Sequence, residues 1–265
     1  MPMEATVRLA SFLGVLMVMS IWEYWAPRRS LTVSKLRRWF CNLCVVFIDS
    51  FVLRLAAPIA AVGVAALAQQ HHWGLFNQVS LPRVLTFGIA IVVLDLAVYL
   101  QHVLFHAVPI LWRVHRMHHT DRDLDATSGL RFHPIEIVLS MLIKVAVVLL
   151  IGAPPEAVIA FEVLLNATSI FNHGNVYIPR AVDRALRCIL VTPDMHRIHH
   201  SIERKETDSN FGFNLPWWDR LFGTYRAEPE KGHERMVIGQ RDCQDERPQR
   251  LGWILRSPFL SRKDF

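Results

Sequence analysis

Histidine is the residue type in this chain whose number and spacing could do chemistry. Of the 13 histidines, eight fall into three short motifs with the spacings H-x3-H, H-x2-H-H and H-x2-H-H. Positions i, i+3 and i+4 share one face of a helix, so each motif would present its imidazoles in one direction. Neutral imidazole is a good ligand for iron, copper or zinc. The eight residues are His102, His106, His115, His118, His119, His196, His199 and His200.

The number of histidines indicates two metal ions rather than one. Packing eight imidazoles together without a metal would leave buried polar groups unsatisfied, which is costly. Eight ligands exceed the capacity of one ion, so we expect two ions, each held by four or five nitrogens. His133 and His173 stand at the ends of apolar stretches and are predicted to complete a set of about ten ligands. His71, His72 and His233 lack this placement and are predicted to be non-ligands.

Long apolar stretches are the elements that must position these motifs. Hydrophobic residues make up 52% of the chain, and a membrane span needs about 20 apolar residues. The sequence predicts an all-α integral membrane bundle of four or five membrane helices, with a kink in the second stretch at Pro58 and a hairpin between the last two. The stretches cover approximately residues 7–26, 42–68, 84–106, 135–151 and 155–172.

The charge distribution predicts which side of the membrane the histidines face. Basic residues cluster between the first two stretches, at Arg28, Arg29, Lys35, Arg37 and Arg38, as is typical of cytoplasmic loops. Counting spans from this loop places every histidine motif on the cytoplasmic side, in a helical cap. Basic residues that cluster between predicted spans favour a membrane protein over one that binds nucleic acid.

Three segments are predicted along the chain. Residues 1–83 would form the N-terminal membrane spans, and residues 84–226 the catalytic domain with the three histidine motifs. Residues 227–265 would form a polar, weakly amphipathic tail that either lies on the membrane surface or packs loosely.

Several polar residues are predicted to support the histidines. Asp95 shares a helix face with His102, and an aspartate within an apolar span is costly and usually functional. We expect Asp95 to orient a ligand histidine from another helix; the alternative is a hydrogen bond between spans. Weaker candidates for such a role are Glu136, Asn172, Asn175, Asp194 and Asp208. A cluster of aromatic residues is predicted either to cap the site or simply to pack, namely Phe211, Phe213, Trp217, Trp218 and Phe222.

The motifs resemble those of the fatty acid hydroxylase and sterol desaturase superfamily. The resemblance extends to R-F-H-P-I-E at residues 131–136, N-H-G-N at 172–175, T-P-D-M-H-R-I-H-H at 192–200 and W-D-R-L-F-G-T at 218–224. It covers roughly residues 90–225. It implies a non-haem di-iron centre that uses O2 to attack a C–H bond of a lipid, with hydroxylated, desaturated or ether-cleaved products.

The leading interpretation is therefore a membrane di-iron oxygenase that hydroxylates or desaturates a sterol, a fatty acyl chain or a related lipid. The sequence has no haem-attachment motif, dinucleotide fingerprint or ferredoxin-type cysteine run, so electrons must come from an external cytochrome or ferredoxin with its NAD(P)H-dependent reductase. A membrane di-zinc hydrolase that uses metal-bound hydroxide is the alternative. A metal transporter or storage protein is disfavoured, because its ligands should lie along a path near mid-membrane.

Overall fold

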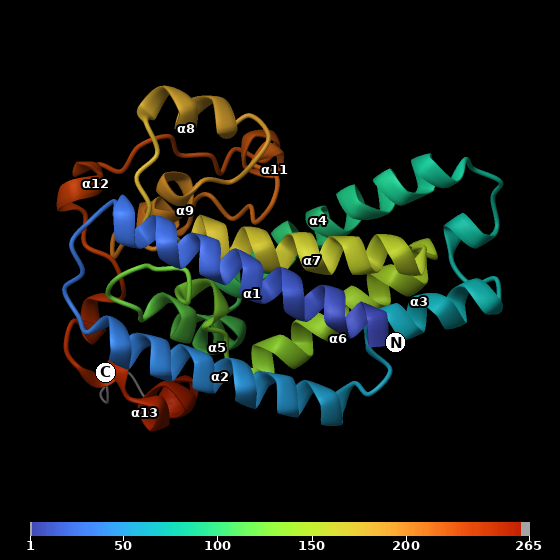
Figure 1. Cartoon of the computed structure of the whole chain (residues 1–265), viewed down its shortest axis with the longest axis horizontal. Helices are drawn as coiled ribbons and strands as arrows, with labels where there is room; N and C mark the ends of the chain where they lie inside the picture. Colours follow the sequence, from blue (N-terminus) through green and yellow to red (C-terminus); the bar gives the residue numbers. More distant parts are fainter. Residues whose placement is uncertain (1, 261–265) are drawn as a thin grey trace.

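The computed structural model describes residues 2–260, which form helices and loops without a β-sheet. Its long helices run side by side, and most of the short helices gather at one end of them (Figure 1). The predicted all-α fold is confirmed, and four helical segments are long and apolar enough to cross a membrane. These segments are Met3–Trp25, Lys35–Asn77, Arg83–Ala107 and Pro134–Ile151. The long helices are α1 (Pro2–Trp25), α2 (Lys35–Ala56), α4 (Arg83–Ala107), α6 (Pro134–Ile151) and α7 (Pro155–Asn172).

The second apolar stretch is broken rather than kinked at Pro58. Helix α2 ends at Ala56, and the separate helix α3 (Ala60–Gln70) follows. Proline has no N–H to donate and disfavours a helical conformation in the residue before it. Ala60 has a φ of 53° at the start of α3, so the chain turns sharply between the two helices.

The predicted hairpin between the last two apolar stretches is confirmed. Helix α6 ends at Ile151, and the following Gly152 takes a left-handed conformation with φ 67° that lets the chain reverse into α7. A close backbone crossing also restricts this turn, because a Cβ on Gly74 would lie 2.2 Å from the Gly152 nitrogen. Helix α7, the fifth predicted span, is not among the four segments that meet the length and hydropathy of a span.

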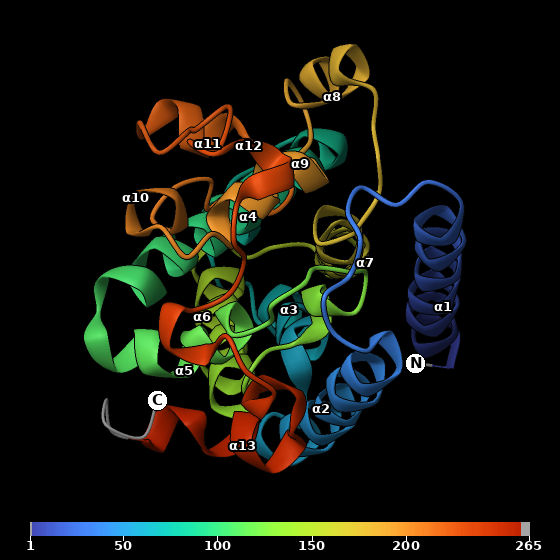
Figure 2. The same cartoon turned by 90° about the vertical axis from the view of Figure 1, so that its left-hand side faces the viewer.

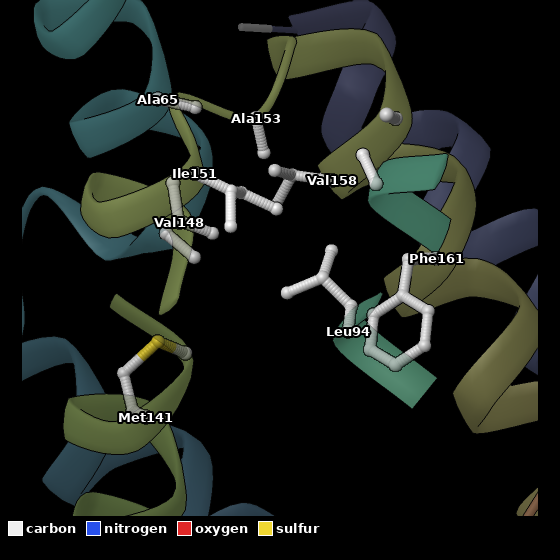
Figure 3. Close-up of a cluster of buried hydrophobic side chains, with 11 residues drawn as sticks. Ala65, Leu94, Met141, Val148, Ile151, Ala153, Val158 and Phe161 are labelled. Atoms are coloured by element: carbon white, nitrogen blue, oxygen red, sulfur yellow. The ribbon is translucent and has the colours of Figure 1, made fainter. Parts of the chain in front are cut away.

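The apolar core of the bundle lies between α3, α4, α6 and α7. Side chains from all four helices converge there, including Leu94 of α4, Val148 of α6 and Phe161 of α7 (Figure 3). Each of these three side chains is at most 1% exposed. This packing fixes the helices that deliver the histidines to one end of the bundle.

Short helices cover that end of the bundle as a cap (Figures 1 and 2). They are α5 (Pro109–His119), α8 (Arg180–Leu186), α9 (Pro193–His199), α10 (Arg204–Thr207), α11 (Trp217–Leu221) and α12 (Gly232–Arg235).

The C-terminal tail packs against the bundle through α13 (Leu251–Arg256). Trp253 and Ile254 join a buried cluster with Cys41 and Val45 of α2 and with Met117 of α5. The tail is therefore part of the folded unit rather than loosely packed, and it contacts the helix that carries the second histidine motif.

Candidate metal centre

Local sequence signals place the helices that carry the three histidine motifs. Helix α4 ends with the first motif, and α5 begins at Pro109, where a proline suits the first helical position. Thr192 caps α9, as its hydroxyl accepts the backbone N–H of Met195 at 3.3 Å. His173 is the residue that follows the last turn of α7. Three helices and one helix end therefore meet at the same place.

The structure brings nine histidines together in two adjacent groups, all of them buried. Within each group the potential ligand atoms lie within 4.8 Å of one another. The groups touch each other, since the rings of His119 and His200 stack with centroids 4.6 Å apart. The five-histidine group consists of His102, His106, His115, His119 and His199. The four-histidine group consists of His118, His173, His196 and His200.

The spacing of the ring nitrogens fits a bound metal ion. The Nε2 atom of His173 lies 3.0 Å from Nε2 of His118, 3.1 Å from that of His196 and 3.2 Å from that of His200. In the five-histidine group, Nε2 of His115 lies 3.1 Å from Nε2 of His102. Two nitrogens bound at right angles to one ion at about 2.1 Å would be separated by about 3 Å. Each group therefore has the dimensions of a shared coordination sphere.

Hydrogen bonds to the other ring nitrogen fix several imidazoles in this orientation. The Nδ1–H groups of His102 and His173 donate to the carbonyl oxygens of Phe211 and Ser169, both at 2.7 Å. His199 Nδ1–H donates to the Ser209 carbonyl at 2.9 Å. Such a bond directs the proton to Nδ1 and leaves the Nε2 lone pair for a metal.

Burial keeps the imidazoles neutral. It lowers the pKa of His173 to about 4 and, together with the neighbouring His115, the pKa of His199 to about 3. The Nε2 atoms of His106 and His199 are buried without a hydrogen-bond partner, an arrangement that is costly unless a ligand satisfies them. Burial also holds the pKa values of His118, His119, His196 and His200 well below 6.5.

The structure does not bring His133 together with the other predicted ligands. Its Nδ1 accepts the backbone N–H of Ile135 at 3.2 Å and caps α6, while Nε2 lies 3.1 Å from the Leu255 carbonyl oxygen. Both ring nitrogens hold helices in place, and the two groups together contain nine of the ten predicted histidines. His71, His72 and His233 lie outside both groups, as predicted.

Asp95 contacts a loop of the cap rather than a histidine. Its carboxylate accepts hydrogen bonds from Asn214 Nδ2 at 2.7 Å and from Trp218 Nε1 at 2.8 Å. The hydroxyl of Thr168 donates to the Oδ1 atom of the same Asn214. Asp95 therefore ties α4 to the cap segment around residues 211–218, and this partner is neither a histidine nor another span.

Of the weaker candidates, Glu136 and Asp208 contact histidines directly. Glu136 Oε1 lies 2.7 Å from Nδ1 of His115, and Asp208 Oδ1 lies 3.2 Å from Nδ1 of His106. The other three hold the cap together instead. Asn172 donates to the Phe213 carbonyl, Asn175 bonds to the backbone of Arg29, and Asp194 pairs with Arg28 and Arg197.

A buried ion network behind α5 was missed by sequence reasoning. Arg38 donates to Asp121 at 2.9 Å and lies 2.8 Å from a carboxylate oxygen of Asp125. Burial alone would raise the pKa of Asp121, but the ion pair with Arg38 holds it below its ordinary value. The alternating acidic run 121–125, directly after the second motif, was the signal available in the sequence. The loop that follows α5 is thereby locked to α2.

Two phenylalanines line the boundary between the two histidine groups. The Phe213 ring lies 5.3 Å from that of His102 in one group and 5.7 Å from that of His196 in the other. Phe132 stacks on His118 at 4.4 Å. The predicted aromatic cluster thus contributes Phe213 to the site, and apolar rings shield the histidines from water.

Loop 126–130 approaches α7 so closely that Gly129 has no room for a side chain. A Cβ there would lie 2.2 Å from the carbonyl oxygen of Ser169, which also accepts the His173 Nδ1–H. We expect Gly129→Ala to cost about 1–3 kcal/mol of unfolding free energy and to lower the metal content of the four-histidine group. Thermal unfolding and metal analysis of the purified protein would measure both effects. The control is Gly88→Ala, where nothing lies within 4 Å; equal losses in both variants would contradict this interpretation.

A second expectation concerns the corrected role of Asp95. Asp95→Ala leaves the donors of Asn214 and Trp218 without their acceptor, which should cost about 1–3 kcal/mol for each buried donor left unsatisfied. We expect turnover and stability to fall more than metal content, because no histidine loses a partner. A double-mutant cycle with Trp218→Phe should show a non-additive coupling. A metal content that falls in parallel with activity would restore the original prediction.

Comparisons with known proteins agree with this geometry. The model of the fatty acid hydroxylase family matches residues 87–224. The chain is 29% identical over 172 residues to ornithine lipid hydroxylase OlsE of Rhizobium tropici, covering 65% of this chain and 51% of that protein. It is 32% identical over 142 residues to human alkylglycerol monooxygenase (52% and 30%) and 27% identical over 165 residues to a Delta(7)-sterol-C5(6)-desaturase of Nicotiana tabacum (59% and 55%). The chain thus spans about half the length, or less, of these relatives. No solved structure matches it.

Proposed function

This chain belongs to the fatty acid hydroxylase family, and we propose that it is an O2-dependent membrane oxygenase that hydroxylates or desaturates a lipid. The observation that supports this most strongly is the pair of buried, all-imidazole groups at one end of an apolar helical bundle. The relatives named above are a lipid hydroxylase, a monooxygenase and a desaturase. They give no support to the di-zinc hydrolase alternative.

Iron is the metal proposed for both groups. Five and four histidines are fewer than the six ligands that an iron ion can take, and iron held there would supply the redox chemistry that O2 activation needs. The residues that would hold it are the nine grouped histidines. Both groups are free of carboxylate ligands, which distinguishes this site from the carboxylate-rich centres of ferritin-like bundles.

The protein's own residues orient the ligands and exclude water. The backbone carbonyls of Phe211, Ser169 and Ser209 accept the Nδ1–H groups of three histidines and fix their tautomers. The rings of Phe132 and Phe213 cover the boundary between the groups with apolar surface. Since Asn214 is anchored to α4 and α7, the neighbouring Phe213 ring is held in place beside the histidines.

The substrate class proposed is a membrane lipid with an alkyl, acyl or sterol skeleton. Many large apolar side chains of the long helices are exposed, among them Leu13, Phe47 and Leu100, which suits a surface covered by lipid. We place the histidine end of the bundle on the cytoplasmic side, because the basic loop 28–38 lies at that end. Electrons would be supplied there by an external cytochrome or ferredoxin with its NAD(P)H-dependent reductase.

The test is a comparison of lipids from cells that express the wild-type chain or its His199→Ala variant under 18O2. We expect one or more lipids in the wild-type cells to gain either one 18O atom or one double bond. The variant should produce neither, because the five-histidine group loses a ligand. Identical lipid profiles in both strains, with both proteins present in the membrane, would contradict the proposal.

A further inference from the structure

One side of the five-histidine group reaches the surface of the cap through Trp112. This half-buried ring lies 4.7 Å from the ring of His106, 5.3 Å from that of His119 and 6.1 Å from that of His115. It is therefore in contact with three of the five grouped histidines. No role was predicted for Trp112 from the sequence, and its ring is separate from Phe132 and Phe213 at the boundary of the two histidine groups.

Arg204, the first residue of α10, lies over the Trp112 ring, and Asp208 follows the helix. The Arg204 guanidinium lies 5.6 Å from the centre of the Trp112 ring and pairs with Asp208. Asp208 in turn lies 3.2 Å from Nδ1 of His106. The exposed Arg204 is thus connected to the buried His106 in two ways, through the Trp112 ring and through the carboxylate of Asp208.

The cationic side chains on and beside α10 outnumber the carboxylates of Glu203 and Asp208 that pair with them. Arg204 and the neighbouring Lys205 are both exposed, and Lys205 forms no ion pair with the described residues. Lys231 and Arg241 lie close by, since both pair with Glu203, the residue before α10. Such a surface attracts an acidic partner and raises its rate of association.

From these contacts we propose that Trp112, Arg204 and Lys205 form the docking and electron-entry site for a small acidic one-electron carrier protein. This inference rests on the proposed function, since hydroxylation and desaturation each consume two electrons and two protons per O2. Each transfer oxidises the carrier by one electron and reduces the metal pair by one, and the protons come from water. Trp112 shortens the distance that the electron must cross, because its ring bridges the cap surface and the ligands.

The experiment uses the full chain in lipid nanodiscs and an acidic plant-type [2Fe–2S] ferredoxin as the probe. Ferredoxin binding is measured at low and high salt, and reduction of the iron-loaded protein is followed anaerobically with reduced ferredoxin or with dithionite. The matched control for Lys205→Glu is Arg184→Glu, the same charge reversal on the exposed face of α8, which is separate from α10 (Figure 2).

We expect Lys205→Glu to weaken ferredoxin binding about tenfold at low salt, with the difference disappearing at high salt. Arg184→Glu should bind like the wild type. Trp112→Leu should lower the ratio of the ferredoxin rate to the dithionite rate at least tenfold, and Trp112→Phe should restore part of it. The ratio is the readout because a general disturbance of the site would lower the rates of reduction by ferredoxin and by dithionite alike.

Several outcomes would overturn this proposal without affecting the oxygenase function. They are equal weakening by the two charge reversals, an unchanged rate ratio in Trp112→Leu, or a wild-type protein that is reduced by dithionite but not by ferredoxin. A Lys205→Glu defect seen with both reductants, and only in nanodiscs of anionic lipid, would show that the patch contacts lipid headgroups instead. A wild-type protein that holds no iron, or whose reduced iron ignores O2, would refute the oxygenase function itself.

Discussion

His173→Asn is expected to remove most of the metal from the four-histidine group and to lower lipid oxidation by at least a thousandfold. The Nε2 atoms of the other three histidines in this group all lie 3.0–3.2 Å from Nε2 of His173. Asparagine is too short to place a donor atom at that position, and three remaining ligands should bind the ion much more weakly. Metal analysis after anaerobic purification, followed by turnover measurements in nanodiscs, would test this.

The same substitution at His133 provides the control. His133 lies outside both groups, and asparagine is a good helix N-cap, so it can replace the bond that Nδ1 accepts from Ile135. We expect His133→Asn to retain the metal content of the wild type and to lose at most about 1 kcal/mol of stability. If His133→Asn lost metal as fully as His173→Asn, the assignment of nine ligands would be wrong.

Arg38→Met should destabilise the fold more than any surface substitution. It leaves the carboxylates of Asp121 and Asp125 buried without their cation, and removal of one partner of a buried ion pair typically costs about 3–5 kcal/mol. For a chain of this size, the thermal midpoint should fall by roughly 10 °C. Circular dichroism or fluorescence of the detergent-solubilised protein during heating would report the midpoint.

The adjacent Arg37 allows a matched comparison. Its side chain is 69% exposed and pairs with the exposed Glu246, so Arg37→Met should change stability by less than about 1 kcal/mol. Arg38→Lys tests the geometry, because lysine keeps the charge but cannot reproduce the forked contacts of a guanidinium. A midpoint for Arg38→Met within 2 °C of the Arg37→Met value would contradict a stabilising role for the network.

The sequence was sufficient to predict the helical fold and most of the site because its signals are local. Each signal can be recognised from residues within a short stretch of sequence. These signals are the histidines at helical spacing, the apolar stretches, and Pro109 and Thr192 at helix starts. The break at Pro58 was predicted only as a kink, because a proline marks the position of a disturbance but not the direction in which the chain continues.

The contacts that the sequence did not predict all join segments that are distant along the chain. His133 stands at the correct helix end, but the tail residue Leu255 occupies one of its nitrogens. Asp95 lies on the expected helix face, yet its partners come from more than a hundred residues away. In the sequence, Arg38 served only to predict which loop is cytoplasmic, and no role was predicted for the acidic run 121–125. The ion pair between Arg38 and Asp121 joins these two segments. Periodicity carries no information about which of these segments meet.

We propose that the nine grouped histidines hold two iron ions that react with O2. The most direct measurement is the iron content of the wild-type protein, purified without oxygen after expression in iron-supplied cells and then exposed to O2 in the reduced state. We expect about two irons per chain, ligated by histidine nitrogens and oxidised as O2 is consumed. Zinc alone at the site, with no consumption of O2 by the reduced protein, would contradict it.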